Sequence, residues 1–300
     1  MFTGCGTAMV TPFLADGSLD ETALHLLVQR QIDAGIDFLV PCGTTGESPT
    51  LAHAEHLRIV EITLEHARGR VPVLAGAGGY NTSEVIALAQ ELAAIGVDGI
   101  LSVTPYYNKP TQEGLYQHYK ALASASALPI VLYSVQGRTG VNIEPATVKR
   151  LAGIEGIVGI KEASGSISQM SAILNSVPND FLVLSGDDAI ALPLIALGGR
   201  GVISVVSNEI PSEMKLLTRL ALQNDFPAAR QLHRRYLSLM EINFVESNPI
   251  PVKAAMAEMG LLKPVWRLPL VPPGRESHAR IRAVLESVNL VERAHAAFPN

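Results

Sequence analysis

The chain has 300 residues, of which 48% are hydrophobic and 17% are charged, and its formal net charge at neutral pH is -5. Without a basic excess it lacks the electrostatic footprint of a nucleic-acid-binding protein. No apolar run reaches the roughly 18 residues of a membrane span. Cys5 and Cys42 provide neither a disulfide framework nor a CxxC metal pair, and residues 1–6 lack the basic region of a signal peptide. We therefore expect a cytoplasmic enzyme or binding protein.

The first predicted elements are an apolar strand over residues 6–12 and a helix that Asp20 caps and Gly35 ends. The same succession of apolar strand, polar or Gly-rich loop and amphipathic helix then recurs along the chain. The further strands are predicted at residues 38–41, 71–75, 99–103, 129–133, 157–161, 181–185 and 201–204.

Near-continuous apolar strands that alternate with helices indicate a parallel sheet covered by helices. No Gly-x-Gly-x-x-Gly motif follows the first strand, so an open dinucleotide-binding sheet is disfavoured. We predict an α/β fold, a (β/α)8 TIM barrel with a helical C-terminal extension. The barrel core is predicted over residues 1–210, and the last barrel helix with a C-terminal helical region over residues 211–300, where strand signals stop.

The reactive side chains of such a barrel lie at the carboxyl ends of its strands. The residues that the sequence places there are Thr44, Thr45, Tyr106, Tyr107, Tyr133, Lys161, Ser185, Gly186 and Ser204.

Lys161 is the most informative of them, because it ends the apolar strand 157–161. A lysine in this setting either pairs with an acid such as Glu162 or is desolvated, and desolvation lowers the pKa of an amine and makes it nucleophilic. No other lysine of the chain ends an apolar strand, and Lys253 is predicted to open a C-terminal helix. We therefore expect Lys161 to form a Schiff base with a carbonyl compound.

Tyr133 ends the strand before that of Lys161, so its phenol can reach the same barrel mouth and act as a general acid or base. Thr44 and Tyr107 are candidates for relaying its proton. The alternative is that Tyr133 is a packing residue with a satisfied hydroxyl.

Two loops are candidate carboxylate sites. The loop 43–46, Gly-Thr-Thr-Gly, offers backbone N–H groups and hydroxyls, although an ordinary strand-to-helix turn would look alike. Arg138, between glycines 137 and 140, suits bidentate binding of a second carboxylate; the alternative is a surface arginine. His53 and His56 do not form an HExxH motif, and no third ligand is evident, so no metal is predicted.

Residues 43–47, 106–107, 133–140 and 159–163 together resemble the pyruvate-dependent class I aldolase superfamily, in order along essentially the whole chain. Residues 248–253 also resemble the C-terminal motif of its branch that condenses pyruvate with aspartate semialdehyde. The resemblance implies a (β/α)8 barrel without a cofactor, usually a homotetramer built as a dimer of dimers. It also implies those two substrates and a place on the diaminopimelate route to lysine.

The resemblance assigns a role to each matching residue. It implies that Lys161 forms the Schiff base with pyruvate and that Tyr133 is the general acid/base. Thr44 and Tyr107 would complete its proton relay, with Tyr107 donated across the tight-dimer interface. The pyruvate carboxylate would be bound by Thr45.

Further substrate contacts follow from the same resemblance. Arg138 would bind the carboxylate of the aldehyde and help to hold Tyr133, while Gly186 and Ile203 would line the pyruvate site through backbone groups. This chain has residues 134–136, Ser-Val-Gln, where the branch commonly has Asn-Val-Pro before Gly-Arg-Thr. Without that proline we expect a looser loop under Arg138.

Members of the branch that lysine inhibits carry an allosteric pocket at the dimer interface. The matching positions here are Ser48, His53, His56, Tyr80, Glu84 and Tyr106. Because Tyr80 replaces the usual asparagine, we predict weak or absent inhibition by lysine.

Two alternatives remain at this point. One is another pyruvate-forming aldolase, such as a 4-hydroxy-2-oxoglutarate, sialic acid or keto-deoxy-sugar aldolase; Arg138 argues against the sugar enzymes, which need no second anion anchor. The other is a catalytically silent barrel that senses a small molecule, against which the presence of Lys161 and Tyr133 argues.

Overall fold

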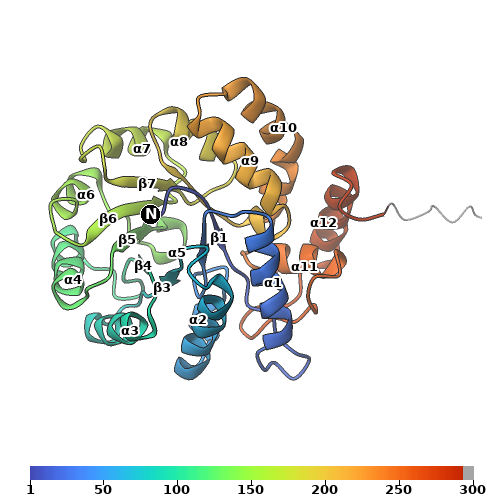
Figure 1. The fold of residues 1–300 in the computed structure, drawn as a ribbon, viewed down its shortest axis with the longest axis horizontal. Helices are drawn as coiled ribbons and strands as arrows, with labels where there is room; N and C mark the ends of the chain where they lie inside the picture. Colours follow the sequence, from blue (N-terminus) through green and yellow to red (C-terminus); the bar gives the residue numbers. More distant parts are fainter. Residues whose placement is uncertain (293–300) are drawn as a thin grey trace, which may run out of the picture.

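The computed structural model describes residues 1–292, in which eight parallel strands form a ring surrounded by helices (Figure 1). The strands pair in the order β2-β1-β8-β7-β6-β5-β4-β3, and a parallel bridge between Leu39 and Val73 joins the two ends of this sheet. The sheet is therefore closed, and the predicted (β/α)8 barrel is confirmed.

The strands of the barrel are β1 (Gly4–Ala8), β2 (Phe38–Val40), β3 (Leu74–Gly76), β4 (Gly99–Val103), β5 (Ile130–Ser134), β6 (Ile157–Glu162), β7 (Leu182–Ser185) and β8 (Gly201–Ser204). The helices are α1 (Glu21–Asp33), α2 (His53–Ala67), α3 (Thr82–Ile95), α4 (Gln112–Ala125), α5 (Gln136–Thr139), α6 (Pro145–Leu151), α7 (Ile167–Leu174), α8 (Ala191–Ala196), α9 (Pro211–Leu222), α10 (Phe226–Ile242), α11 (Ile250–Glu258) and α12 (Arg275–Ser287). Two short 3-10 helices are η1 (Ser48–Thr50) and η2 (Val206–Asn208).

The bounds of the first strand differ most from the prediction. The apolar run 6–12 predicted a strand to Pro12, but β1 ends at Ala8. Beyond it the N–H of Val10 donates to the side-chain oxygen of Asn208 (3.2 Å), so a side chain replaces a neighbouring strand as the backbone partner. Apolar character alone could not reveal this change.

Side chains of the strands fill the inside of the barrel, as in other barrels of this size. This inner cluster includes Leu101, Val131, Tyr133, Leu184 and Ile203. A second, larger apolar cluster packs between the outer face of the strands and the helices. Tyr133 and Ile203, two of the predicted site residues, therefore belong to this interior cluster.

The chain after β8 is helical, as the sequence predicted. Helices α11 and α12 lie outside the helix ring, on the side of α1 and α9 (Figure 1). Residues 293–300 of the predicted C-terminal region lie outside the described residues, and the division of the chain at residue 210 stays a prediction. Within residues 1–292, no helix combines the length and apolar character needed to cross a membrane.

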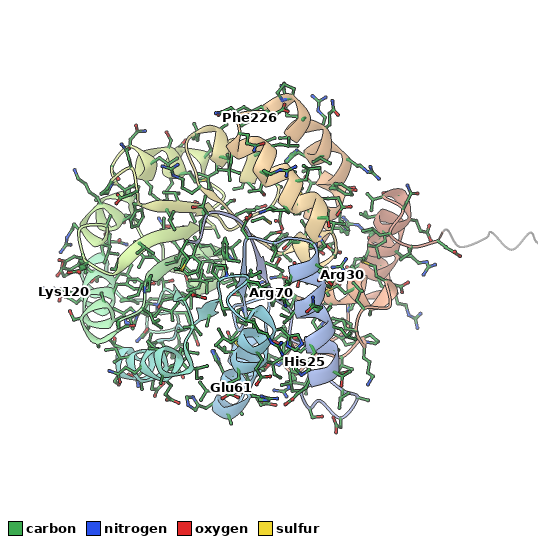
Figure 2. All side chains as sticks on the ribbon, viewed as in Figure 1. His25, Arg30, Glu61, Arg70, Lys120 and Phe226 are labelled. Carbon is green, nitrogen blue, oxygen red and sulfur yellow. The ribbon has the colours of Figure 1, made fainter. Side chains whose placement is uncertain are left out.

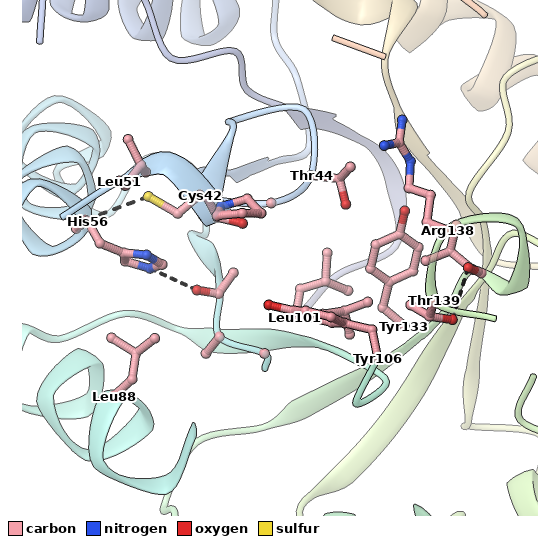
Figure 3. A pocket seen from close by; sticks show the side chains of 18 of the residues that line it. Cys42, Thr44, Leu51, His56, Leu88, Leu101, Tyr106, Tyr133, Arg138 and Thr139 are labelled. Atoms are coloured by element: carbon pink, nitrogen blue, oxygen red, sulfur yellow. Dashed lines mark hydrogen bonds between the residues drawn. The ribbon is translucent and has the colours of Figure 1, made fainter. Parts of the chain in front are cut away.

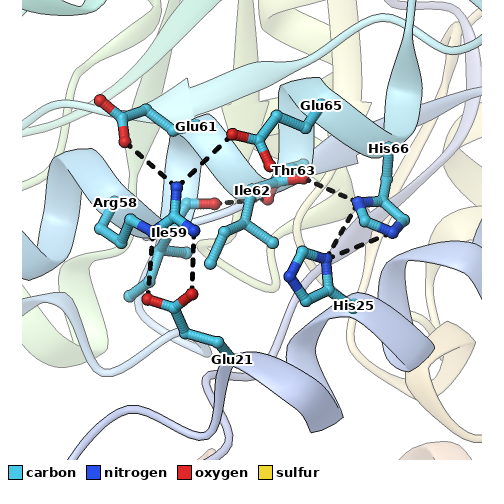
Figure 4. Close-up of polar contacts among 9 residues, drawn as sticks. All are labelled: Glu21, His25, Arg58, Ile59, Glu61, Ile62, Thr63, Glu65 and His66. Carbon is cyan, nitrogen blue, oxygen red and sulfur yellow. Dashed lines mark hydrogen bonds and ion pairs between the residues drawn. The ribbon is translucent and has the colours of Figure 1, made fainter.

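The outer faces of α1 and α2 meet through polar contacts (Figure 4). Arg58 donates two hydrogen bonds to the carboxylate of Glu21 (3.0 and 2.9 Å), and the rings of His25 and His66 lie with centroids 4.4 Å apart. Exposed ion pairs of this kind contribute at most about 1 kcal/mol. The two helices are therefore held mainly by the buried apolar side chains beneath these contacts.

Glu209 is a buried acid that follows η2. Its carboxylate accepts a hydrogen bond from the Asn243 amide (2.6 Å), while the other carboxylate oxygen has no partner among the described residues. Burial raises the pKa of Glu209 from its ordinary 4.5 to about 8, and the nearby charge of Asp188 adds to the rise. Glu209 is therefore protonated in the folded protein at neutral pH.

This buried acid predicts how stability depends on pH. The folded state holds a proton on Glu209 that the unfolded chain releases above about pH 4.5, so the group lowers stability progressively as pH rises from 4.5 to about 8. We expect Glu209→Gln to remove this decline, because glutamine does not titrate. The gain in free energy of unfolding of the variant over the wild type should therefore be larger at pH 9 than at pH 5, by on the order of a few kcal/mol. Thermal unfolding at both pH values measures the effect.

Glu241→Gln is the matched control, because Glu241 is exposed on α10. An equal change of melting temperature at pH 5 and pH 9 in the Glu209 variant would contradict this prediction.

Candidate active site

Lys161 and Tyr133 face each other across neighbouring strands. The register of β5 and β6 makes the two residues direct partners, and the Lys161 Nζ lies 4.4 Å from the centroid of the Tyr133 ring. Both side chains are buried. The structure thus brings the predicted nucleophile and the predicted acid/base together.

The alternative that Lys161 pairs with Glu162 is wrong. Successive side chains of a strand point to opposite faces, and the Glu162 carboxylate accepts hydrogen bonds from the Ser164 N–H (3.2 Å) and the Gln169 amide (2.8 Å). Burial raises the pKa of Glu162. Among residues 1–292 no acid forms an ion pair with Lys161.

Gly186 lies where the aliphatic part of the Lys161 side chain passes close to the backbone, which leaves no room for a larger residue. A Cβ atom at this position would lie 3.1 Å from Lys161 Cε and 2.5 Å from the Ala163 Cβ. The Gly186 N–H donates to the Glu162 carbonyl (2.8 Å), which ties the end of β7 to β6. A larger residue would therefore displace Lys161 or open the sheet.

A cavity of about 460 Å³ opens at the ends of β3, β4 and β5, and Lys161 lies next to its lining residue Tyr133 but is not itself part of the lining. Figure 3 shows Thr44, Tyr133 and Arg138 at one end of it and His56 with Leu88 at the other. The predicted site residues in its lining are Thr44, Ser48, His53, His56, Tyr106, Tyr133 and Arg138. Three residues of the predicted chemistry and four of the predicted allosteric positions therefore share one cavity.

Other predicted residues lie outside this lining. The side chain of Tyr107 is 89% exposed, and its φ of +42° turns the chain sharply after Tyr106. Tyr80 packs edge-on against the Tyr106 ring, with centroids 5.2 Å apart. Glu84, in the first turn of α3, accepts a hydrogen bond from the Asn81 amide (2.8 Å). Within one chain, Tyr107 is thus separate from Tyr133.

Arg138 lies on α5, a helical turn that the sequence did not predict. The turn ends at Gly140, whose φ of +67° suits a glycine. The Thr139 hydroxyl donates to the Val141 carbonyl (2.9 Å), and Arg138 Nη2 donates to the Asn248 carbonyl (2.7 Å). Hydrogen bonds therefore hold the segment that carries Arg138.

Thr45 is buried, and its hydroxyl oxygen accepts a hydrogen bond from the Asn248 amide (2.9 Å). Asn248 therefore contacts both predicted carboxylate anchors, Thr45 through its side chain and Arg138 through its backbone. Sequence reasoning noted this residue only as part of a motif, because its partners are remote in the chain.

A buried ion pair beside this loop was also missed. The Lys253 Nζ lies 2.5 Å from the Glu47 Oε1, and both side chains are fully buried. Burial lowers the pKa of Lys253, while the Glu47 carboxylate opposes that shift. Lys253 was predicted to open a helix, and α11 begins three residues earlier, at Ile250. The apolar neighbours of Lys253 in 250–256 were a signal that the lysine is buried.

Cys42 lines the cavity but is not a nucleophile. It is buried, and burial raises the pKa of its thiol far above the usual range, so the thiol stays neutral. Within residues 1–292, no three or more His, Cys, Asp or Glu side chains are grouped as a metal ion would require.

Comparison with known proteins places this geometry in a family. The model of the Dihydrodipicolinate synthetase family matches residues 1–288. A 4-hydroxy-tetrahydrodipicolinate synthase from Koribacter versatilis is 53% identical, over 98% of this chain and 98% of the relative. The dihydrodipicolinate synthase structure from Thermotoga maritima superposes with a TM-score of 0.95 at 44% identity, over 97% of this chain and 100% of that one. A chloride-inhibited dihydrodipicolinate synthase from Acinetobacter baumannii, solved in complex with pyruvate, gives a TM-score of 0.95 at 43% identity, over 97% and 100% of the two chains. The chain belongs to the dihydrodipicolinate synthetase family.

Proposed function

We propose that this protein condenses pyruvate with L-aspartate 4-semialdehyde, the reaction of a 4-hydroxy-tetrahydrodipicolinate synthase. One observation carries the proposal: Lys161 is buried at a strand end, has no acidic partner among residues 1–292 and lies against the Tyr133 ring. The names of the relatives, and the pyruvate complex of the protein from A. baumannii, support the same substrates.

The reaction begins at Lys161. Its neutral amine attacks the keto carbon of pyruvate, the carbinolamine loses water, and a protonated Schiff base forms. Tyr133 delivers the proton that the leaving hydroxyl needs and takes one from the methyl carbon, which gives the enamine. Thr44, which lines the same cavity, and Tyr107 relay these protons.

The enamine carbon then attacks the aldehyde, and a new carbon–carbon bond forms while the aldehyde oxygen takes up a proton. The amino group of the condensed product attacks the former keto carbon and releases Lys161 as the ring closes. One water is lost overall. Arg138 binds the carboxylate of the aldehyde, Thr45 that of pyruvate, and backbone groups of Gly186 and Ile203 line the pyruvate site.

The proposed assembly is a cytoplasmic homotetramer, a dimer of dimers. The large apolar side chains exposed among the described residues include two pairs that we assign to the interfaces. Tyr80 and Tyr107 form one pair, and Ile167 on α7 with Leu197 after α8 forms the other. Tyr107 would then reach Tyr133 of the partner subunit, from which it is separate within one chain.

The Schiff base is tested by reduction with borohydride in the presence of pyruvate. We expect a covalent pyruvyl adduct on Lys161 and none in Lys161→Arg, because a guanidinium does not form the imine. Lys120→Arg is the control, since Lys120 lies on the outer side of α4 (Figure 2) and its loss leaves the adduct intact. Mass spectrometry of peptides locates the adduct, and its absence from Lys161 would end the proposal.

The second substrate is tested with the same preparation. We expect turnover with aspartate semialdehyde, and Arg138→Ala should raise its KM about tenfold or more by removing a charge-assisted contact. An adduct without condensation of this aldehyde would favour a different pyruvate aldolase, such as a 4-hydroxy-2-oxoglutarate aldolase.

The donation of Tyr107 across an interface is tested by mixing two inactive variants. In a hybrid of Lys161→Ala and Tyr107→Phe subunits, one site combines an intact Lys161 with a Tyr107 from the partner. Random pairing makes about half of the dimers hybrids, and one of the two sites in each hybrid is restored. We therefore expect mixing and reassembly to restore up to about one quarter of wild-type activity. Activity that stays at the level of the separate variants would show that Tyr107 acts within its own chain.

Regulation by lysine is predicted to be weak or absent, because the Tyr80 ring packs on Tyr106 at the proposed allosteric site. We expect Tyr80→Asn to increase inhibition by lysine, and Tyr80→Phe, which keeps the ring, to leave it unchanged. Steady-state rates across a lysine titration measure both. Half-inhibition of the wild type at micromolar lysine would refute the prediction.

A further inference from the structure

Asn248 joins two anion anchors that belong to distant parts of the chain. Its side-chain amide donates to the Thr45 hydroxyl oxygen (2.9 Å), and its backbone carbonyl accepts from Arg138 Nη2 (2.7 Å). The residue itself is buried and precedes α11. One residue therefore contacts the loop after β2 and the helical turn after β5.

The direction of the first hydrogen bond matters for chemistry. A threonine hydroxyl has one proton to donate and two lone pairs to accept with. Because Asn248 donates, the Thr45 oxygen acts as acceptor and keeps its own proton for another partner. Among the described residues none accepts a hydrogen bond from that hydroxyl. The hydrogen bond from the Asn248 amide thus restrains the rotation of the Thr45 hydroxyl and leaves the hydroxyl proton without an acceptor among the described residues, so that it can be donated to an anion.

The position of Asn248 is fixed from two sides. Five residues after it, Lys253 makes its buried ion pair with Glu47, which lies two residues after Thr45. The loop after β2 and the start of α11 are therefore linked twice, by the Thr45–Asn248 hydrogen bond and by the Glu47–Lys253 pair. A shift of Asn248 relative to Thr45 would therefore also disturb the Glu47–Lys253 ion pair.

We infer that Asn248 is a positioning residue that orients the Thr45 hydroxyl as a hydrogen-bond donor to the carboxylate of pyruvate. This inference rests on the proposed function. The side chain of Asn248 serves the pyruvate site, whereas Arg138 depends only on its backbone carbonyl. A change of the side chain should therefore weaken the binding of pyruvate and spare the aldehyde.

Asn248→Asp tests this separation with a side chain of the same shape. An aspartate accepts the Thr45 proton instead of donating to the hydroxyl, and it places a negative charge beside the bound carboxylate. We expect the KM for pyruvate, and the pyruvate concentration that half-saturates borohydride trapping, to rise at least about tenfold. The KM for aspartate semialdehyde should change less than about twofold. Asn224→Asp, which adds the same charge in the exposed turn between α9 and α10, should change neither.

A structural role alone would give a different pattern. The double variant Asn248→Ala with Thr45→Val separates the two, because alanine adds no charge near the bound carboxylate and an effect that acts through Thr45 adds nothing once its hydroxyl is gone. If Asn248→Asp unfolds the protein, the single variant Asn248→Ala replaces it in the KM and trapping measurements, since it buries no charge. Three results would each overturn the inference. They are equal rises of both KM values, an effect of Asn248→Ala on pyruvate binding that persists in the Thr45→Val background, and unchanged pyruvate trapping by an Asn248 variant that folds. Failure of the wild type itself to trap pyruvate would overturn the proposed function as well.

Discussion

The buried ion pair between Glu47 and Lys253 is the constraint on which the arrangement of the site depends. Burying either charge alone is costly, and breaking such a pair by removing one partner typically costs about 3–5 kcal/mol. The pair joins residues 206 positions apart, with a separation of 2.5 Å, and the Lys253 ammonium also lies over the Phe13 ring. It therefore fixes the loop after β2 to α11, and through that loop it fixes Thr44 and Thr45.

Lys253 and Lys161 show how environment divides one residue type into two roles. Lys253 is buried with a carboxylate at contact distance, so its charge is neutralised and its nitrogen is occupied. Lys161 is buried with its Nζ over the Tyr133 ring, and among residues 1–292 no acid pairs with it. A buried lysine without a paired acid suits the nucleophilic role that we propose for Lys161.

The barrel and the central residues of the site were predictable because their signals are local. Each strand is a mainly apolar run of three to six residues between polar loops, and a parallel barrel places the carboxyl ends of all strands at one mouth. Lys161 and Tyr133 could thus be expected together before their register was known. The bounds of β1 were wrong, because the pairing of Val10 depends on Asn208, far along the chain. Contacts of that kind leave no mark on local periodicity.

The same limit explains why Asn248, Glu47 and Lys253 escaped prediction as a unit. The loop after β2 and the start of α11 are about 200 residues apart, and only folding brings their polar groups into contact. In the proposed reaction this has a consequence for specificity. Arg138 and Thr45 are both tied to Asn248, so the spacing between the two carboxylate anchors is set by one buried residue and not by two independent loops. A substrate pair with carboxylates at that spacing fits without rearrangement of the site, whereas a neutral sugar aldehyde would leave the Arg138 guanidinium without its anion.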